Sequence, residues 1–162
     1  MDTTVIIVSY KSDHLIEKNI AIFDKEIKII IIDNSQNKNL KEDIENNHEN
    51  VTVILNSNKG FGQAANLGAK LAKTKYIFFC SPDNLIEKNA INRQKKICKD
   101  LKDEFGILIL SEKKEIISKN IKIEKPSGAL CFFIQRKIFL EMSGFDENFF
   151  LYYEDQDLLK RF

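Results

Sequence analysis

The chain of 162 residues has no tryptophan, two prolines, six glycines and two histidines. So little proline and glycine excludes a collagen-like or low-complexity chain, and a hydrophobic content of 43% excludes a disordered one. The length suits one domain with a sizeable core and is short for two. We therefore expect a single folded domain over residues 1–162.

An excess of charge of either sign is also missing. The 25 Lys and Arg residues nearly balance the 24 Asp and Glu residues, which leaves a net charge of +1. The protein as a whole then has no positive electrostatic potential that would attract nucleic acid, and any site for an anion has to be formed by a local group of residues. The cysteines Cys80, Cys98 and Cys131 include no closely spaced pair that would indicate zinc or redox chemistry, and they fit a reduced, cytoplasmic compartment.

Long hydrophobic runs are absent as well. The purely apolar stretches, such as residues 29–32, are far too short to cross a bilayer. The first residues lack the basic start and apolar run of a signal peptide. We expect a cytoplasmic protein for which peripheral contact with the inner face of the membrane stays open.

What the sequence does contain is an alternation of buried strands and amphipathic helices. Continuous apolar, β-branched segments predict strands over 4–10, 27–32, 51–55 and 76–80. Apolar residues at three- and four-residue spacing predict helices after Ser12 and over 64–73 and 87–104, and a polar, weaker helix is expected over 40–47. The alternation predicts an α/β domain with a mainly parallel central sheet and helices on both faces. Short strands over 107–110, 115–117 and 129–134 then indicate a more antiparallel second half.

Polar residues follow several of these strands, where the ligands of open α/β sheets bind. Ser9 and Tyr10 come at the end of the first strand, Asp33 ends the second, and Asp83 comes after the fourth. A carboxylate at position 83 can ligate a divalent cation that bridges a diphosphate. A simple Asx turn is the alternative for both acids.

A glycine-containing stretch, residues 58–68, follows the third strand and opens a helix. Free amides and the helix dipole at such a position favour a phosphate. The candidate nucleotide ligands in this stretch are Asn58, Lys59, Gly60, Gly62 and Asn66.

Two other interpretations of this stretch stay open. Residues 60–65 satisfy the dinucleotide fingerprint in its Gly/Ala form, with Asp83 as the ribose acid, which would indicate an NAD-type oxidoreductase. Against it, the glycines follow the third strand instead of the first, where the fingerprint belongs. The other alternative is a purely structural glycine turn.

Near the end of the chain, the aromatic segment 149–153 leads into the acids Glu154, Asp155 and Asp157 at the start of a helix. Acids in a first turn ordinarily complement the helix dipole. The functional interpretation is that one carboxylate acts as general base on a sugar hydroxyl while the rings supply an apolar wall.

Taken together, these segments resemble the family 2 glycosyltransferases with the glycosyltransferase A-type fold, particularly their rhamnosyltransferase-like branch. Five segments come in the family's order: residues 8–10, 32–35, 58–68, 81–83 and 144–158. The resemblance implies inverting hexosyl transfer from a UDP- or dTDP-sugar, such as dTDP-rhamnose. The acceptor would be a saccharide or a lipid-linked molecule in bacterial surface polysaccharide synthesis.

The resemblance also assigns roles on the donor side. Ser9, Tyr10 and Asp33 would hold the nucleoside, and Asp83 matches the last acid of the family's metal-binding Asp-x-Asp. Ser81 stands at the first acid of that motif. The expected Mg²⁺ or Mn²⁺ would then be held by one carboxylate together with phosphates and water, which Mg²⁺ tolerates.

On the acceptor side, Asp155 matches the acid usually assigned as catalytic base, and Glu154 looks like a supporting group. The sequence ends at Phe162, where relatives continue with helices that shape the acceptor side. We therefore expect a domain shortened on that side. The alternative to an enzyme is a truncated, non-catalytic nucleotide-binding domain.

Overall fold

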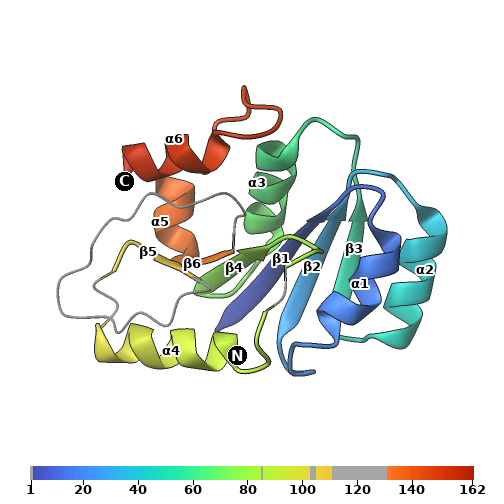
Figure 1. Ribbon diagram of the computed structural model, residues 1–162, viewed down its shortest axis with the longest axis horizontal. Coiled ribbons are helices and arrows are strands. Elements are labelled where there is room, and N and C mark those ends of the chain that lie inside the picture. Colours follow the sequence, from blue (N-terminus) through green and yellow to red (C-terminus); the bar gives the residue numbers. More distant parts are fainter. Residues whose placement is uncertain (1, 85, 103–104, 111–130) are drawn as a thin grey trace.

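The computed structural model describes residues 2–84, 86–102, 105–110 and 131–162 (Figure 1). No helix in these ranges has both the length and the apolar character that crossing a membrane requires. In chain order the elements are β1 (Thr3–Ser9), α1 (Asp13–Ile20), β2 (Lys28–Asp33), α2 (Lys38–Asn47), β3 (Val51–Leu55), α3 (Phe61–Leu71), β4 (Tyr76–Cys80), α4 (Ala90–Asp100), β5 (Ile107–Ile109), β6 (Phe132–Gln135), α5 (Arg136–Glu141) and α6 (Glu154–Arg161).

The strands form one six-stranded sheet in the order β3-β2-β1-β4-β6-β5. β1 pairs in parallel with β2 and β4, and β2 pairs in parallel with β3. β6 is antiparallel to both β4 and β5. The expectation of a mainly parallel sheet with an antiparallel later part is confirmed. β1 lies inside the sheet and is covered on both faces, which is why its sequence is continuously apolar and does not alternate.

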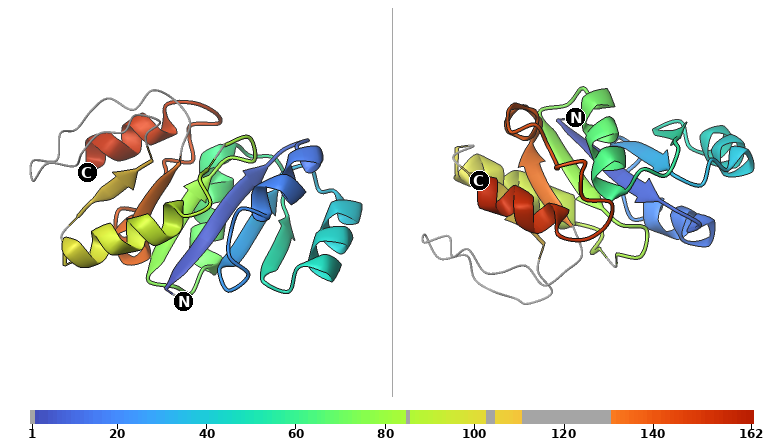
Figure 2. Two further views of the ribbon diagram at one scale, coloured as in Figure 1. Left: turned by 60° about the horizontal axis from the view of Figure 1, so that its bottom comes forward. Right: turned by 90° about the horizontal axis from the view of Figure 1, so that it is seen from above.

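Helices cover both faces of this sheet (Figure 2). α1, α2 and α4 pack on one face, and α3, α5 and α6 pack on the other. Successive residues of a strand point to opposite faces, so Phe78 belongs to the first core and Phe79 to the second. The second core is rich in aromatic rings, because Phe139 and Phe145 pack around Phe79 at centroid distances of 5.0 and 5.6 Å.

The structure differs from the sequence predictions at some element boundaries and in one added helix. α3 begins at Phe61, three residues before the expected start, and α4 begins at Ala90, three residues after its expected start. The helix α5 was not expected, because its six residues are too few for a helical period to show in the sequence. The strand expected at 115–117 lies outside the described residues.

Candidate functional site

The carboxyl ends of the parallel strands meet at one edge of the sheet. Ser9, at the end of β1, is the register partner of Asp33, at the end of β2, and Cys80 at the end of β4 pairs with Ile7 of β1. The Ser9 side chain is fully buried, and its hydroxyl has no hydrogen-bond partner among the described residues. Because an unpaired buried hydroxyl is unfavourable, Ser9 has the capacity to bind a polar atom of a ligand.

Asp33 has a structural role at this edge. Its side chain is fully buried, and both carboxylate oxygens accept backbone N–H groups. The N–H of Ser35 donates to Oδ1 at 3.0 Å, and the N–H of Asn37 donates to Oδ2 at 2.7 Å. Asp33 thus forms the turn that leads from β2 into α2, as the Asx-turn alternative predicted. Its direct contact with a nucleoside stays a prediction.

Asn34 joins three parts of the edge, and sequence reasoning did not select it as a site residue. Its N–H donates to the Ser9 carbonyl at 2.8 Å, and its Oδ1 accepts from Asn56 Nδ2 at 2.8 Å. Its Nδ2 donates to Asn58 Oδ1 and to the Gly60 carbonyl, both at 3.4 Å. The buried Asn34 therefore ties the end of β1 to the loop after β3. Its position in a run of turn-forming residues was the only sequence signal.

The glycine loop before α3 is shaped by a distant part of the chain. Gly60 has φ +102°, and a Cβ there would collide with the backbone of Phe150. The Gly60 N–H donates to Asn58 Oδ1 at 3.2 Å, and the Phe61 N–H donates to the Phe150 carbonyl at 3.1 Å. Two amides that we expected to be free for a phosphate are therefore engaged. The side chains of Asn58 and Lys59 remain exposed beside them.

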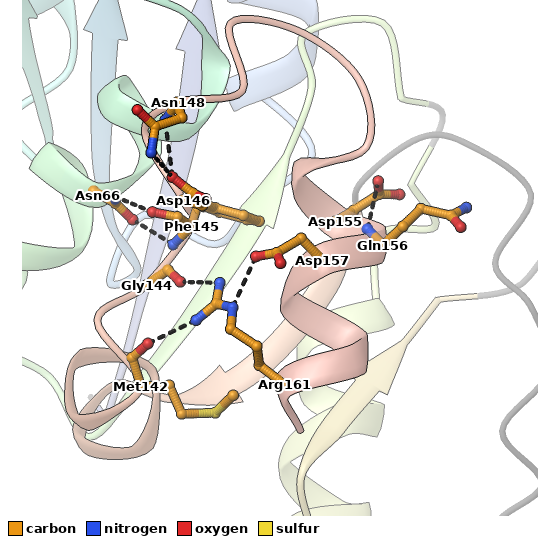
Figure 3. A network of polar contacts seen from close by, with 10 residues as sticks. All are labelled: Asn66, Met142, Gly144, Phe145, Asp146, Asn148, Asp155, Gln156, Asp157 and Arg161. Atoms are coloured by element: carbon orange, nitrogen blue, oxygen red, sulfur yellow. Dashed lines mark hydrogen bonds and ion pairs between the residues drawn. The ribbon is translucent and has the colours of Figure 1, made fainter.

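Gly62 and Asn66 face the segment 144–147, and Figure 3 shows the bonds between Asn66 and Phe145. A Cβ on Gly62 would lie 3.0 Å from the Cβ of Phe145. Asn66 Oδ1 accepts the Phe145 N–H at 2.9 Å, and its Nδ2 donates to the Phe145 carbonyl at 2.9 Å and to Glu147 Oε1 at 3.0 Å. These contacts account for both residues structurally, and their predicted contact with a nucleotide stays a prediction.

Tyr10 and Lys11 stand exposed just beyond β1. The Tyr10 side chain is 50% exposed, and Lys11 Nζ lies 5.3 Å from the centroid of its ring. The Lys11 N–H donates to Ser35 Oγ at 2.5 Å, and this bond fixes the backbone that joins Tyr10 to Lys11. An accessible ring suits a nucleoside base, and the ammonium group beside it suits a phosphate. Lys11 was not a sequence candidate.

Asp83 lies on an exposed turn after β4. Asn84 closes this turn, because its Oδ1 accepts the Ser81 N–H at 2.7 Å and its own N–H donates to the Ser81 carbonyl at 3.1 Å. From α1, Asn19 Nδ2 donates to the carbonyls of Ser81, Pro82 and Asn84 at 3.3–3.5 Å. The Asp83 carboxylate itself makes no hydrogen bond with another described residue. Asn84 and not Asp83 therefore holds the turn, and the Asp83 carboxylate is available for a ligand.

The described residues contain no group of three or more His, Cys, Asp or Glu side chains that could hold a metal ion. A single accessible carboxylate is compatible with Mg²⁺, which is commonly bound by one or two carboxylates together with substrate phosphates and water. The donor set therefore fits a cation that arrives with a diphosphate, at Asp83, and does not fit a site made by protein ligands alone.

α6 places Glu154 and Asp155 side by side, in different surroundings. Glu154 is buried with its Oε2 unpaired among the described residues, and burial together with the nearby charge of Asp155 raises the pKa of Glu154. Asp155 is partly exposed, and within the described residues its Oδ1 accepts one bond, from the Gln156 N–H at 2.8 Å, while its Oδ2 accepts none (Figure 3). Asp155 is thus the accessible carboxylate of the two.

The segment that precedes α6 connects these acids to the glycine loop. The carbonyl of Phe150 contacts the start of α3, and Asp155 follows it by five residues. A chain of that length spans at most about 17 Å. The side chains of Phe150, Tyr152 and Tyr153 in this segment are 57–71% exposed.

Residues 4–152 match the profile of glycosyl transferase family 2. The chain belongs to this family. No curated protein matches the sequence.

Solved structures share the fold of this family 2 domain. A crystal structure of S. aureus TarS 1–349 is 18% identical, with a TM-score of 0.74 over 99% of this chain and 55% of that one. Its complex with UDP is 17% identical, with a TM-score of 0.72 over 96% and 53%. Its complex with UDP-GlcNAc is 16% identical, with a TM-score of 0.67 over 90% and 49%. The family 2 domain thus spans about half the length of these structures.

The expected glycosyltransferase A-type fold is confirmed, and so is membership of family 2. The family match gives no support to the dinucleotide interpretation of residues 60–65. Gly60 and Gly62 are instead explained by their close packing against Phe150 and Phe145. The rhamnosyltransferase-like branch stays a prediction.

Proposed function

We propose that this family 2 domain transfers a hexose from a nucleoside diphosphate donor to a hydroxyl group of an acceptor. The observation that carries the proposal is the family match over residues 4–152, which includes the whole edge bearing Ser9, Asp33 and Asp83. The structures of S. aureus TarS with UDP and UDP-GlcNAc, which share the fold, support a UDP-sugar as donor. A dTDP-sugar, such as dTDP-rhamnose, is the donor suggested by the sequence resemblance.

On the donor side, the nucleoside would lie against Ser9 and Tyr10, with Asp33 holding the turn behind them. The exposed Lys59 would face the phosphates. Asp83 would hold Mg²⁺ or Mn²⁺, and such a cation, when bound, neutralises charge that develops on the diphosphate leaving group.

On the acceptor side, Asp155 would act as general base. The acceptor oxygen attacks the anomeric carbon from the face opposite the diphosphate, and its proton passes to the Asp155 carboxylate. The bond from the anomeric carbon to the diphosphate breaks, and the electron pair leaves with the nucleoside diphosphate, so the configuration inverts. Base assistance of this kind contributes about 10²–10⁴-fold in rate. Glu154 lies buried beside Asp155 and would support it.

The acceptor proposed is a saccharide or a lipid-linked molecule of bacterial surface polysaccharide synthesis. A lipid-linked acceptor would bring a cytoplasmic protein to the inner face of the membrane. The balanced net charge of +1 is the reason that no nucleic acid is proposed as partner.

Calorimetric titration of UDP and dTDP, with Mg²⁺, with Mn²⁺ and with EDTA, tests the donor side. One nucleotide should bind about tenfold more tightly with a cation, and Asp83→Asn should remove that gain while leaving the affinity in EDTA unchanged. Asp100→Asn, at an exposed aspartate at the end of α4, is the matched control and should keep the gain. Failure of both nucleotides to bind would refute the proposal.

Release of the nucleotide from UDP-GlcNAc, UDP-glucose and dTDP-rhamnose tests the chemistry. Asp155→Asn should slow release by about 10²-fold or more while nucleotide binding is retained. Nucleotide binding without turnover of any donor would instead support the non-catalytic nucleotide-binding domain.

A further inference from the structure

α6 is a short helix whose own sequence does little to fix its position. It has eight residues, and its N-cap residue, Tyr153, makes no side-chain capping hydrogen bond. Isolated helices of this length are marginal in water. Leu158 is its one buried apolar side chain. The direction in which α6 presents Asp155 must therefore be set by tertiary contacts.

Arg161, in the last turn of α6, makes three hydrogen bonds (Figure 3). Its Nε donates to Asp157 Oδ2, one NH2 group donates to the Met142 carbonyl, and the other donates to the Gly144 carbonyl, all at 2.7 Å. The planar guanidinium group holds these donors in fixed relative directions, so it sets the rotation of the helix as well as its distance. A lysine ammonium group, a single point charge, cannot span the three acceptors.

The turn that receives Arg161 is itself rigidly placed. Ser143 and Gly144 have φ values of +65° and +66°, and the Gly144 N–H donates to the Phe139 carbonyl at 2.8 Å. The next residue, Phe145, exchanges two hydrogen bonds with Asn66 of α3. An unbroken series of contacts therefore runs from α6 through the turn 142–145 to the helix that follows the glycine loop.

We propose that Arg161 is a positioning residue that fixes the Asp155 carboxylate relative to α3. Arg161 lies six residues after Asp155, about 9 Å along the helix axis, so it acts on the carboxylate through the helix. Without the guanidinium contacts, α6 can rotate about the buried Leu158 side chain. The Asp155 carboxylate then has no fixed orientation relative to α3. The inference rests on the proposed function, because it gives Asp155 the role of base.

The test compares Arg161→Ala and Arg161→Lys with Lys160→Ala. Lys160 is exposed, lies on the same helix and makes no hydrogen bond with a described residue, so its variant controls for the lost charge. Three quantities are measured: the kcat for hydrolysis of UDP-GlcNAc, with water as acceptor; the Kd for UDP; and hydrogen exchange of the α6 amides.

Arg161→Ala should lower kcat about tenfold or more, keep the Kd for UDP within about twofold, and speed exchange in α6. Arg161→Lys should recover only a small part of kcat, and Lys160→Ala should match the unmodified protein. General loss of structure would instead weaken UDP binding together with kcat.

Two results would overturn the inference: a kcat for Arg161→Ala equal to that of Lys160→Ala, or unchanged exchange in α6. An unmodified protein that binds UDP but hydrolyses no donor would refute the proposed function and, with it, the role of Arg161 in positioning a catalytic base. In that case, hydrogen exchange of the α6 amides alone decides whether Arg161 fixes the position of α6.

Discussion

Replacing Asn66 by alanine distinguishes the two roles that this residue has been given. The sequence predicted that Asn66 binds a nucleotide, whereas the structure places its amide group against Phe145 and Glu147 at 2.9–3.0 Å. Asn66 is 4% exposed, so its bonds to the Phe145 backbone lie in the interior. A structural role predicts a loss of stability, and a ligand role predicts a loss of nucleotide affinity.

The size of the effect follows from the groups left behind. Alanine at position 66 leaves the N–H and the carbonyl of Phe145 without partners, and an unsatisfied buried group costs about 1–3 kcal/mol. Two such groups, with some relaxation, lower the free energy of unfolding by about 2–4 kcal/mol. For a domain of this size the Tm then falls by about 5–15 °C.

Urea unfolding measures the stability, and UDP titration, well below the lowered Tm, measures the affinity. We expect the loss of stability together with a Kd for UDP within about twofold of the unmodified protein. Asn39→Ala, at an exposed position of α2, is the matched control and should change stability by less than about 0.5 kcal/mol. A stability loss below about 0.5 kcal/mol with a tenfold weaker Kd would refute the reasoning and return Asn66 to the nucleotide site.

Three further predictions concern the glycine loop, the buried acid and the thiols. Gly60→Ala should lower the free energy of unfolding by about 1–3 kcal/mol in thermal or urea unfolding, because φ +102° favours glycine and the new Cβ meets Phe150; an unchanged Tm would contradict this. Because burial raises the pKa of Glu154, the folded state holds its proton more tightly than the unfolded state. The free energy of unfolding should therefore fall as the pH rises above 4.5, the ordinary pKa of a glutamate, and Glu154→Gln should remove that part of the fall in urea titrations; an identical pH dependence would show that Glu154 does not cause it. Burial raises the pKa of Cys80 well above its ordinary value and that of Cys131 to about 12, so a chromogenic thiol reagent should react with them only after unfolding; rapid reaction of the native protein would disprove it.

The strands and the edge of the sheet could be predicted because their signals are local. A strand covered on both faces, such as β1, must be apolar at nearly every position, and this appears directly in the sequence. Once the alternation indicates parallel strands, their carboxyl ends meet at one edge. Ser9 and Asp33 could therefore be placed together before any coordinates, and their register confirms it.

The contacts within the candidate site could not be predicted, because they join residues far apart in the chain. Asn34 bonds Asn58, 24 residues away, and the Arg161 donors reach carbonyls 17 and 19 residues away. Gly60 owes its conformation to Phe150, which lies ninety residues later. The same glycine stretch had fitted a phosphate loop, a dinucleotide fingerprint and a structural turn.

By itself, the sequence determined the family and the order of the strands and helices apart from α5, since the burial pattern and the order of the motifs are properties of neighbouring residues. Only the tertiary structure decided which polar groups are available for chemistry. The side chains of Asp33 and Asn66 are hydrogen-bonded to backbone groups, whereas Asp83 and Asp155 keep accessible carboxylate oxygens. The physical reason is that a buried polar group must find a hydrogen-bond partner, and folding brings that partner from elsewhere in the chain.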